Sequence, residues 1–223
     1  MKDYPIFLNI RNKPCVVLGG GDVAERKVVS LLCAGARVTV VSPEFTVNLV
    51  RMGEDGEILL IKRPYQGGDL KGAFLAYAAT DDKDINNRVY MEGSKEGILL
   101  NVADEPGMCD FIVPSVVKRG ALSIAISTGG ASPAFAKRLR MEMEERYGEE
   151  CSVFLEVMAA IRQKLLTKGS VSGKNRKIFN KLASSSMPDM IKMERWDEVD
   201  ETIVSLLGED FSLASLGLQK IGR

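Results

Sequence analysis

The chain has 223 residues, of which 45% are hydrophobic and 27% are charged. This composition can bury a sizeable core, so it predicts one large globular domain or two smaller ones and excludes global disorder. Lysine plus arginine and aspartate plus glutamate both number 30, and the resulting zero formal net charge argues against bulk affinity for nucleic acid or for a membrane surface.

Histidine is absent, which removes the usual general base near neutral pH and the commonest metal ligand. Acid–base chemistry must then come from carboxylates, Lys, Tyr, Cys or solvent, and we predict no metal site. The cysteines are far apart and form no CxxC motif, which favours free thiols in a reducing cytosol over disulfides or a metal cluster: Cys15, Cys33, Cys109 and Cys151. The N-terminal residues lack an apolar signal core and no apolar run could span a bilayer, so we expect a cytoplasmic protein with no membrane partner.

The first hundred residues alternate between short β-rich runs and stretches with helical spacing of apolar residues. Continuously apolar strands that alternate with helices indicate a parallel sheet covered on both faces, which predicts a Rossmann-like doubly wound α/β domain over 1–113. We expect strands within 14–21, 37–42, 57–63, 72–80 and 98–103, and helices within 22–36, 43–56 and 82–97.

The character of the chain changes after about Asp110. Two β runs flank Arg119-Gly120 with no helix between them, which predicts an antiparallel ribbon. Ser132 suits an N-cap and Pro133 the first helical position, so a helix should start there. We expect a small α+β segment over 114–148 and an all-helical domain over 149–223, with polar breaks at 166–177 and 184–189.

The stretch "VVLGGGDVAERK" joins a predicted strand to a predicted helix through a glycine loop. Gly19 permits the tight turn, Gly21 lets the backbone approach a pyrophosphate, and the small Ala24 lets the helix pack on the strand. A diphosphate would lie at the helix N-terminus, where free N–H groups favour anions. The pattern favours dinucleotide binding over a purely structural turn.

An acidic residue at the end of the second strand usually binds the ribose 2′-hydroxyl of the cofactor. Here Ser42 and Pro43 occupy the strand end, and Glu44 follows at the start of the predicted helix. No Arg or Lys stands beside this strand end to hold a 2′-phosphate, so we predict NAD rather than NADP.

Two later strands end in polar residues that would reach the same edge of the sheet, because ligands of doubly wound folds bind beyond the carboxyl ends of the strands. Thr80 and Asp81 follow the fourth strand, and Asn101 and Val102 end the fifth. We assign all four to cofactor binding. Asp82, in contrast, is better explained as the N-cap of the next helix.

Adjacent carboxylates, Asp104 and Glu105, follow the fifth strand where it meets a loop. Turn geometry explains Asp104 as well as catalysis does on these residues alone, since Asp and Pro are common in turns. If Asp104 is catalytic, we expect it in a partly buried cleft.

A second glycine-rich loop enters the helix that Ser132 is expected to cap. Such a loop suits an anionic, carboxylate-bearing ligand, although the basic residues Lys137, Arg138 and Arg140 are equally explained as a solvated helix face. The candidate substrate contacts are Ser127, Thr128, Gly129, Gly130, Ser132 and Lys137.

Taken together, these motifs resemble the siroheme synthase dehydrogenase/ferrochelatase family, that is, precorrin-2 dehydrogenase modules. The resemblance covers residues 1 to about 147 and is carried by "PIFLNIRNKPCVVLGGGDVAERK", "AATDDKDINNRVY" and "NVADEPGMCDFIVPSVVKRGALSIAISTGGASPAFAKRLR". The C-terminal stretch matches only in length and helical character.

The resemblance implies NAD-dependent oxidation of precorrin-2 to sirohydrochlorin, followed in several members by insertion of Fe²⁺, a substrate, in the same cleft. It also implies a homodimer held by the central segment, and a separate uroporphyrinogen methyltransferase that supplies the tetrapyrrole. Asp22, Val23, Pro43 and Glu44 fall at the NAD contacts, and Thr128 falls where some members carry a modifiable Ser. Asp104 matches the key aspartate of the family.

With no His in the chain, Asp104 is the expected base that takes a proton from the macrocycle while the nicotinamide takes a hydride. Basic residues such as Lys118, Arg119, Lys137 and Arg138 could offset the carboxylates of the substrate. The alternative from a different class is a non-catalytic NAD-sensing dimeric module, and an assay for NADH formation distinguishes the two.

Overall fold

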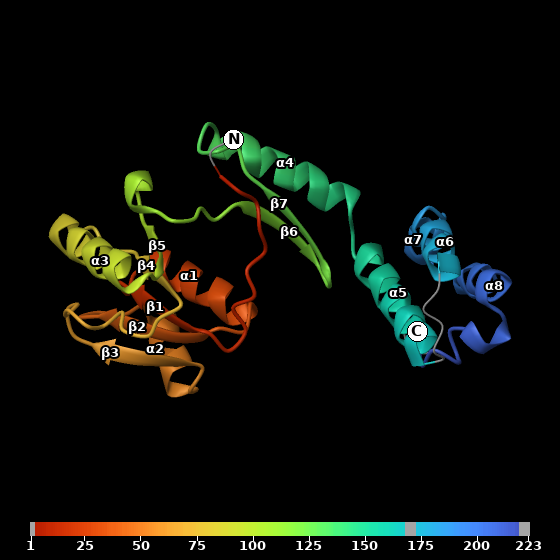
Figure 1. Cartoon of the computed structure of the whole chain (residues 1–223), viewed down its shortest axis with the longest axis horizontal. Helices are drawn as coiled ribbons and strands as arrows, with labels where there is room; N and C mark the ends of the chain where they lie inside the picture. The colour runs from red at the N-terminus through yellow and green to blue at the C-terminus, as the bar shows by residue number, and fades with distance from the viewer. Residues whose placement is uncertain (1–2, 168–172, 219–223) are drawn as a thin grey trace. The chain divides into compact units, whose positions relative to one another are not determined.

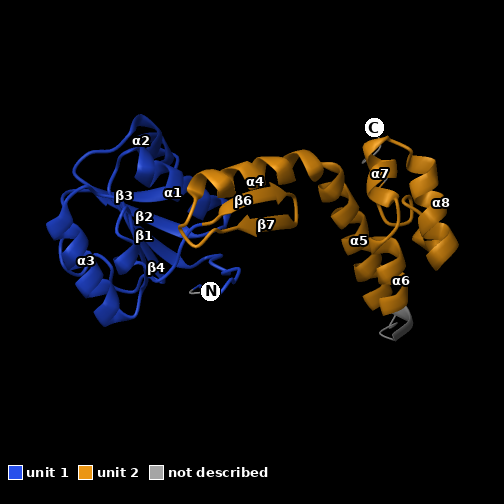
Figure 2. Ribbon diagram, turned by 90° about the horizontal axis from the view of Figure 1, so that it is seen from above, with its two compact units in different colours: residues 1–113 blue, residues 114–223 orange. Residues whose placement is uncertain are grey.

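The computed structural model describes residues 3–167 and 173–218, and the side chains of 173–175 lie outside this description. The chain divides into two compact units, residues 1–113 and residues 114–223, which Figure 2 shows in different colours. We call them unit 1 and unit 2 and describe each by itself.

Unit 1 is built around a five-stranded parallel sheet with the strand order β3-β2-β1-β4-β5 (Figure 1). The chain adds strands to one side of β1 and then crosses to add β4 and β5 on the other side, so the order reverses between β1 and β4. The elements are β1 (Pro14–Leu18), α1 (Asp22–Cys33), β2 (Arg37–Ser42), α2 (Val47–Glu54), β3 (Ile58–Lys62), β4 (Leu75–Ala78), α3 (Lys83–Glu96), β5 (Leu99–Val102) and the 3₁₀ turn η1 (Pro106–Met108).

Helices cover both faces of the sheet, which explains why its central strands are continuously apolar. On one face the side chain of Val17 packs with Val28 of α1 and Leu49 of α2. On the other face Leu18 packs with Val89 of α3 and with Leu100. All six side chains are at most 1% exposed, and the predicted Rossmann-like parallel sheet is confirmed.

Helix α2 begins later than the sequence pattern indicates. We expected a helix over 43–56, but residues 43–46 form a loop and the helix runs from Val47 to Glu54. The Thr46 hydroxyl accepts a hydrogen bond from the Leu49 N–H and so caps the helix three residues later than Pro43 suggested. The Thr46 N–H also donates to the Gly20 carbonyl oxygen at 2.9 Å, which holds the loop against the glycine turn.

Unit 2 contains the predicted antiparallel ribbon and a set of helices. The ribbon joins β6 (Ser115–Arg119) to β7 (Leu122–Ile126), and α4 (Pro133–Arg146) follows with Ser132 as its N-cap, as predicted. Val157, Ile161, Leu182 and Ile203 are fully buried in the core of the helices that come next. These are α5 (Glu150–Thr167), α6 (Gly173–Ala183), α7 (Met187–Lys192), α8 (Trp196–Leu207) and the 3₁₀ turn η2 (Glu209–Phe211).

The predicted polar breaks are shorter than expected. Helix α5 extends to Thr167 and α6 begins at Gly173, while residues 168–172 lie outside the described residues. Helix α7 begins within the second break at Met187, because Pro188 is tolerated in a first helical turn. All four cysteines are free thiols, as predicted. Over the described ranges, no helix has the length and apolar character needed to cross a bilayer.

The Asp82 carboxylate accepts hydrogen bonds from the Asp84 and Ile85 N–H groups at the start of α3, so the capping interpretation of this residue is confirmed. We therefore expect Asp82→Ala to lower the free energy of unfolding of unit 1 by about 1 kcal/mol. The measurement is hydrogen exchange of the slowest β1 amides, which reports unit 1 separately from unit 2. Lys83→Ala, at the neighbouring exposed position, is the control and should change the value by less than about 0.5 kcal/mol. Equal exchange in the two variants would contradict the capping role.

Candidate active site

The carboxyl ends of β1, β4 and β5 lie at one edge of the sheet. Leu18 is in register with Ala78, and Ala78 is in register with Val102, so the loops that follow the three strands start side by side. Two backbone hydrogen bonds continue this alignment beyond the strands, from the Ala79 N–H to the Leu18 carbonyl at 2.7 Å and from the Ala103 N–H to the Ala78 carbonyl at 2.8 Å. The edge lies where the strand order reverses, which is the usual ligand site of such folds.

The three glycines of the loop after β1 have different surroundings. Gly19 has a φ of +116°, and a Cβ atom there would lie 2.2 Å from the Ala79 carbonyl oxygen. A Cβ on Gly20 would lie 1.9 Å from the Glu44 carbonyl oxygen. A Cβ on Gly21, in contrast, would meet no atom within 4 Å. The protein's own packing therefore requires the first two glycines, while the backbone at the third is open. The contact of Gly21 with a pyrophosphate stays a prediction.

The N-terminus of α1 has no side-chain cap. Gly21 is its N-cap residue, so the N–H groups of Asp22, Val23 and Ala24 have no partners inside the helix. Free N–H groups and the helix dipole together favour a diphosphate at this position. Ala24 is fully buried, which fits its predicted role in packing the helix on the sheet. The open Gly21 and the uncapped helix thus fit a dinucleotide.

The loop after β2 is tied to α1 by Glu25, which the sequence analysis did not single out. The Glu25 carboxylate accepts hydrogen bonds from the Thr46 hydroxyl and from the Asn48 amide, and these bonds lower the pKa of Glu25. Pro43 and Glu44 are exposed beside the glycine loop, whereas Ser42 is only 7% exposed beneath Gly20. The contacts of Ser42, Pro43 and Glu44 with the cofactor stay predictions. Ser42 packs beneath Gly20 and so supports the glycine loop.

Thr80 and Asp81 follow β4 at the same edge. The Thr80 hydroxyl accepts a hydrogen bond from the Asp82 N–H at 3.0 Å, and its carbonyl accepts one from the buried Asn86 amide at 3.0 Å. Thr80 is therefore held in place, while Asp81 is exposed. The structure brings both residues to the edge, and their binding role remains a prediction.

Asp104 lies at the end of β5 in an unusual backbone conformation. Its φ of +60° is left-handed, which is uncommon for a residue other than glycine. The expectation of a partly buried cleft is wrong for the described chain, because Asp104 is exposed and its carboxylate makes no hydrogen bond or ion pair there. Asp104 is exposed because it lies in the turn beyond the end of β5, which the Glu105 N–H closes by donating to the Val102 carbonyl at 3.4 Å. Glu105 directly precedes the 3₁₀ turn η1 as its N-cap residue.

Asn101 and Val102 have partners inside the protein. The Asn101 side-chain amide donates to the Phe111 carbonyl oxygen at 2.9 Å, and the Val102 N–H donates to the Cys109 sulfur at 3.3 Å. Val102 is buried and Asn101 is half-buried. These contacts give the two residues a structural role at the edge, and a direct contact with a cofactor stays a prediction.

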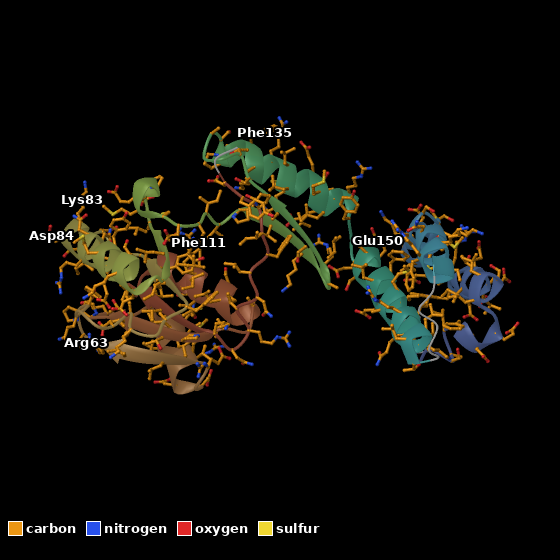
Figure 3. All side chains as sticks on the ribbon, in the orientation of Figure 1. Arg63, Lys83, Asp84, Phe111, Phe135 and Glu150 are labelled. Atoms are coloured by element: carbon orange, nitrogen blue, oxygen red, sulfur yellow. The ribbon has the colours of Figure 1, made fainter. Side chains whose placement is uncertain are left out.

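A half-buried lysine on α1 is a further feature that the sequence analysis missed. The Lys27 ammonium lies 5.2 Å from the ring centre of Tyr77, and the Phe111 ring, labelled in Figure 3, meets Tyr77 edge-on at 5.5 Å. Burial lowers the pKa of Lys27 and raises the pKa of Tyr77 to about 12. Helical spacing could have predicted that Lys27 is partly buried. Position 27 lies three residues after the buried Ala24 and four before the buried Leu31, so it lies on the same face of α1.

In unit 2 the second glycine loop is organised by its own hydroxyl groups. Ser127 accepts a hydrogen bond from the Gly129 N–H, Thr128 from the Ser132 N–H, and Ser132 from the Phe135 N–H. A Cβ on Gly129 or Gly130 would meet no atom within 4 Å, so this loop also has open backbone. The structure places these predicted substrate contacts together in one loop.

The basic residues of unit 2 divide between ion-paired and free side chains. Arg138 and Arg140 pair with Glu142 and Glu144 one turn along α4. The exposed Arg138 pair supports the solvated-face interpretation, whereas Arg140 and Glu144 are half-buried. Arg119 pairs with Glu149 at 3.4 Å. Lys118 and Lys137 are exposed and form no ion pair in the described part of the chain, which leaves these two for an anionic ligand.

The parallel sheet, the glycine loop and the uncapped helix define a dinucleotide-binding protein of Rossmann type. Comparison with known proteins agrees. Residues 6–115 match a family described as "Putative NAD(P)-binding", and residues 119–146 match the family "Sirohaem biosynthesis protein central".

Two similar curated proteins are both named siroheme synthase. A siroheme synthase of Methylobacillus flagellatus is 40% identical over 80% of this chain and 38% of its own length. A siroheme synthase of Nitrosococcus oceani is 36% identical over 95% of this chain and 45% of its own length. A solved structure titled "SirC, precorrin-2 dehydrogenase" superposes with a TM-score of 0.75 at 24% identity, covering 92% of this chain and 98% of that one, and so supports the fold.

The chain therefore belongs to the family formed by the N-terminal part of the siroheme synthases, and unit 1 is its NAD(P)-binding domain. It spans less than half the length of these two relatives.

The open position at Gly21 generates a test of the nucleotide site. An alanine there has room and an allowed extended backbone, so the fold should be unchanged, but its methyl group would occupy the approach of a diphosphate. We expect Gly21→Ala to raise the Kd for NAD⁺ at least about tenfold, or ~1.4 kcal/mol, by calorimetry. Gly67→Ala is the matched control, since a Cβ at Gly67 also meets nothing within 4 Å. Gly67 lies in the β3–β4 loop, where the neighbouring Gly68 N–H donates to Glu92 in the last two turns of α3. Wild-type affinity in Gly21→Ala would contradict the assignment.

Proposed function

We propose that the protein is an oxidoreductase that converts precorrin-2 to sirohydrochlorin with NAD⁺ in siroheme biosynthesis. One observation carries the proposal: the open, uncapped start of α1 and the free carboxylate of Asp104 follow strands that end at the same edge of one sheet. The names of the relatives support the substrate, since they are siroheme synthases and the similar structure is titled a precorrin-2 dehydrogenase.

In this proposal each edge residue has a separate task. Bound NAD⁺ supplies the hydride acceptor. The Asp22–Ala24 N–H groups hold its diphosphate, and the loop tied down by Glu25 presents Glu44 to the ribose end. Asp104 takes the proton that leaves the macrocycle, because its exposed carboxylate has no competing partner in the described chain and no histidine exists to do so.

The remaining parts of the proposal concern assembly and supply. Residues 114–148 form the dimerisation segment of a homodimer, and residues 149–223 form a separate helical domain. Exposed apolar side chains, among them Val116 on β6 and Phe135 on α4, give the central segment a surface suited to a second copy. A separate uroporphyrinogen methyltransferase provides the tetrapyrrole substrate, and the open loop from Ser127 to Gly130 with Lys137 receives its carboxylates.

Fe²⁺ enters the proposal as a second substrate. Iron insertion requires two pyrrole N–H protons to leave, and Asp104 can accept them in turn, passing the first to solvent before it takes the second. The chain has no histidine, so the nitrogen atoms of the tetrapyrrole supply the main ligands.

Asp104→Asn tests the proposed base. The amide keeps the size and left-handed tolerance of the side chain but cannot accept the proton, so NADH formation from precorrin-2 should fall at least about 100-fold. The Kd for NAD⁺ should stay within about twofold of wild type, because the glycine loop is untouched. Glu105→Gln, which changes the neighbouring carboxylate, is the control and should keep wild-type turnover. Near wild-type turnover in Asp104→Asn would reject the assignment.

The same assay separates the alternative function. A wild-type protein that binds NAD⁺ and forms no NADH from precorrin-2 would instead be an NAD-sensing module.

The chelatase step has its own test. Sirohydrochlorin and Fe²⁺ are mixed with the protein under anaerobic conditions, and the siroheme absorption spectrum is followed against a reaction without protein. We expect siroheme to form faster with wild-type protein, and Asp104→Asn to remove most of that increase. Equal rates with and without wild-type protein would show that another protein inserts the iron.

A further inference from the structure

Strand β5 is an edge strand, and its backbone alternates between a paired and an open side. The Leu99 and Ala103 N–H groups point to the β4 side, where they donate to the carbonyl oxygens of Phe74 and Ala78. The Leu100 and Val102 N–H groups therefore point to the open edge. Unpaired edge groups usually require water or a covering segment.

Residues 109–111, which we call the return segment, cover this open edge. The Asp110 N–H donates to the Leu100 carbonyl at 2.8 Å, and the Asp110 carboxylate accepts from the Leu100 N–H at 2.9 Å. The Asn101 side chain adds a bond to the Phe111 carbonyl. Backbone and side-chain groups of the return segment thus take the place of a neighbouring strand. They also hold the two ends of the loop between Val102 and Cys109 together.

The Cys109 thiol holds the outer end of β5 and the turn after it. Its sulfur accepts a hydrogen bond from the Val102 N–H at 3.3 Å. Its S–H lies within reach of the carbonyl oxygens of Val102, at 3.3 Å, and Glu105, at 3.4 Å. These backbone groups lie on both sides of Asp104. The sulfur therefore links the two ends of the turn that carries the proposed base.

The conformation of Asp104 needs such support. A left-handed φ at a residue other than glycine is normally kept only where the surroundings determine it. The Asp104 side chain provides none of this support, because it has no partner in the described chain. The restraint comes from the hydrogen bonds around it. The Ala103 N–H donates to the Ala78 carbonyl at 2.8 Å and the Glu105 N–H donates to the Val102 carbonyl at 3.4 Å, and the Cys109 thiol adds its bonds to Val102 and Glu105 on either side of residue 104.

We propose that Cys109 is a positioning residue for Asp104, and that it sets the direction of the carboxylate through its bonds to Val102 and Glu105. This inference rests on the proposed function for its kinetic consequence. A serine can replace the thiol, because a hydroxyl group also donates and accepts, whereas an alanine leaves the Val102 N–H without its partner.

The experiment compares Cys109→Ala and Cys109→Ser in the full-length chain. Cys33→Ala, which removes an exposed thiol at the end of α1, is the matched control. We measure turnover of precorrin-2, the Kd for NAD⁺, the thermal midpoint, and hydrogen exchange of the Val102 amide. We expect Cys109→Ala to lower kcat by about 10- to 100-fold, with the Kd for NAD⁺ within about twofold and faster Val102 exchange. Cys109→Ser should recover most of the turnover, and Cys33→Ala should match wild type.

The outcomes separate the two proposals. Wild-type kcat in Cys109→Ala overturns the positioning role, and so does a serine variant as slow as the alanine variant with an unchanged thermal midpoint. If wild-type protein itself forms no NADH, the proposed function fails. Faster exchange of the Val102 amide in Cys109→Ala alone would then still support Cys109 as the restraint on the turn, and unchanged exchange would reject that too.

Discussion

The parallel pairing of β1 with β4 is the contact on which the site depends. It places Leu18 opposite Ala78, so that the glycine loop and the β4–α3 connection leave the sheet together. The contact is close enough that Gly19 can carry no side chain against the Ala79 carbonyl. The next pairing, β4 with β5, brings the turn with Asp104 to the same edge. Asp104 is more than eighty positions from the glycine loop in the sequence, and the two pairings bring it to the same edge of the sheet.

The positive potential at the start of α1 comes from backbone groups and not from side chains. The chain has no net formal charge, and the first turn of α1 carries two acidic residues, Asp22 and Glu25. An anion can still bind, because the uncapped N–H groups and the helix dipole supply the positive end. Glu25 is occupied with Thr46 and Asn48, which directs its charge to the β2–α2 loop. Glu25 thus holds the β2–α2 loop against α1.

The buried parts of the fold could be predicted from local patterns. Strands covered on both faces are continuously apolar, and Ser132 and Asp82 cap helices with the side chains expected of N-caps. The start of α2 could not be predicted, because it depends on Thr46 meeting Gly20 and Glu25 from elsewhere in the chain. The proposed role of Cys109 could not be predicted either. Its bond to the Val102 N–H is possible only because β5 is an edge strand with an open side. The Asp and Pro of this stretch were consistent with a turn at Asp104, but its left-handed φ and its exposure became clear only from the structure.

The most direct test of this site is a titration with NAD⁺ followed by the backbone amide resonances of the full-length protein. The central claim is that one sheet edge both binds the dinucleotide and presents Asp104. We expect the largest shifts at the amides of Gly21, Asp22, Val23 and Ala24, with smaller shifts at Thr80 and in the turn around Asp104. Shifts confined to other surfaces, such as the β3–β4 loop near Gly68 and Lys71, with Gly21–Ala24 unchanged, would contradict it.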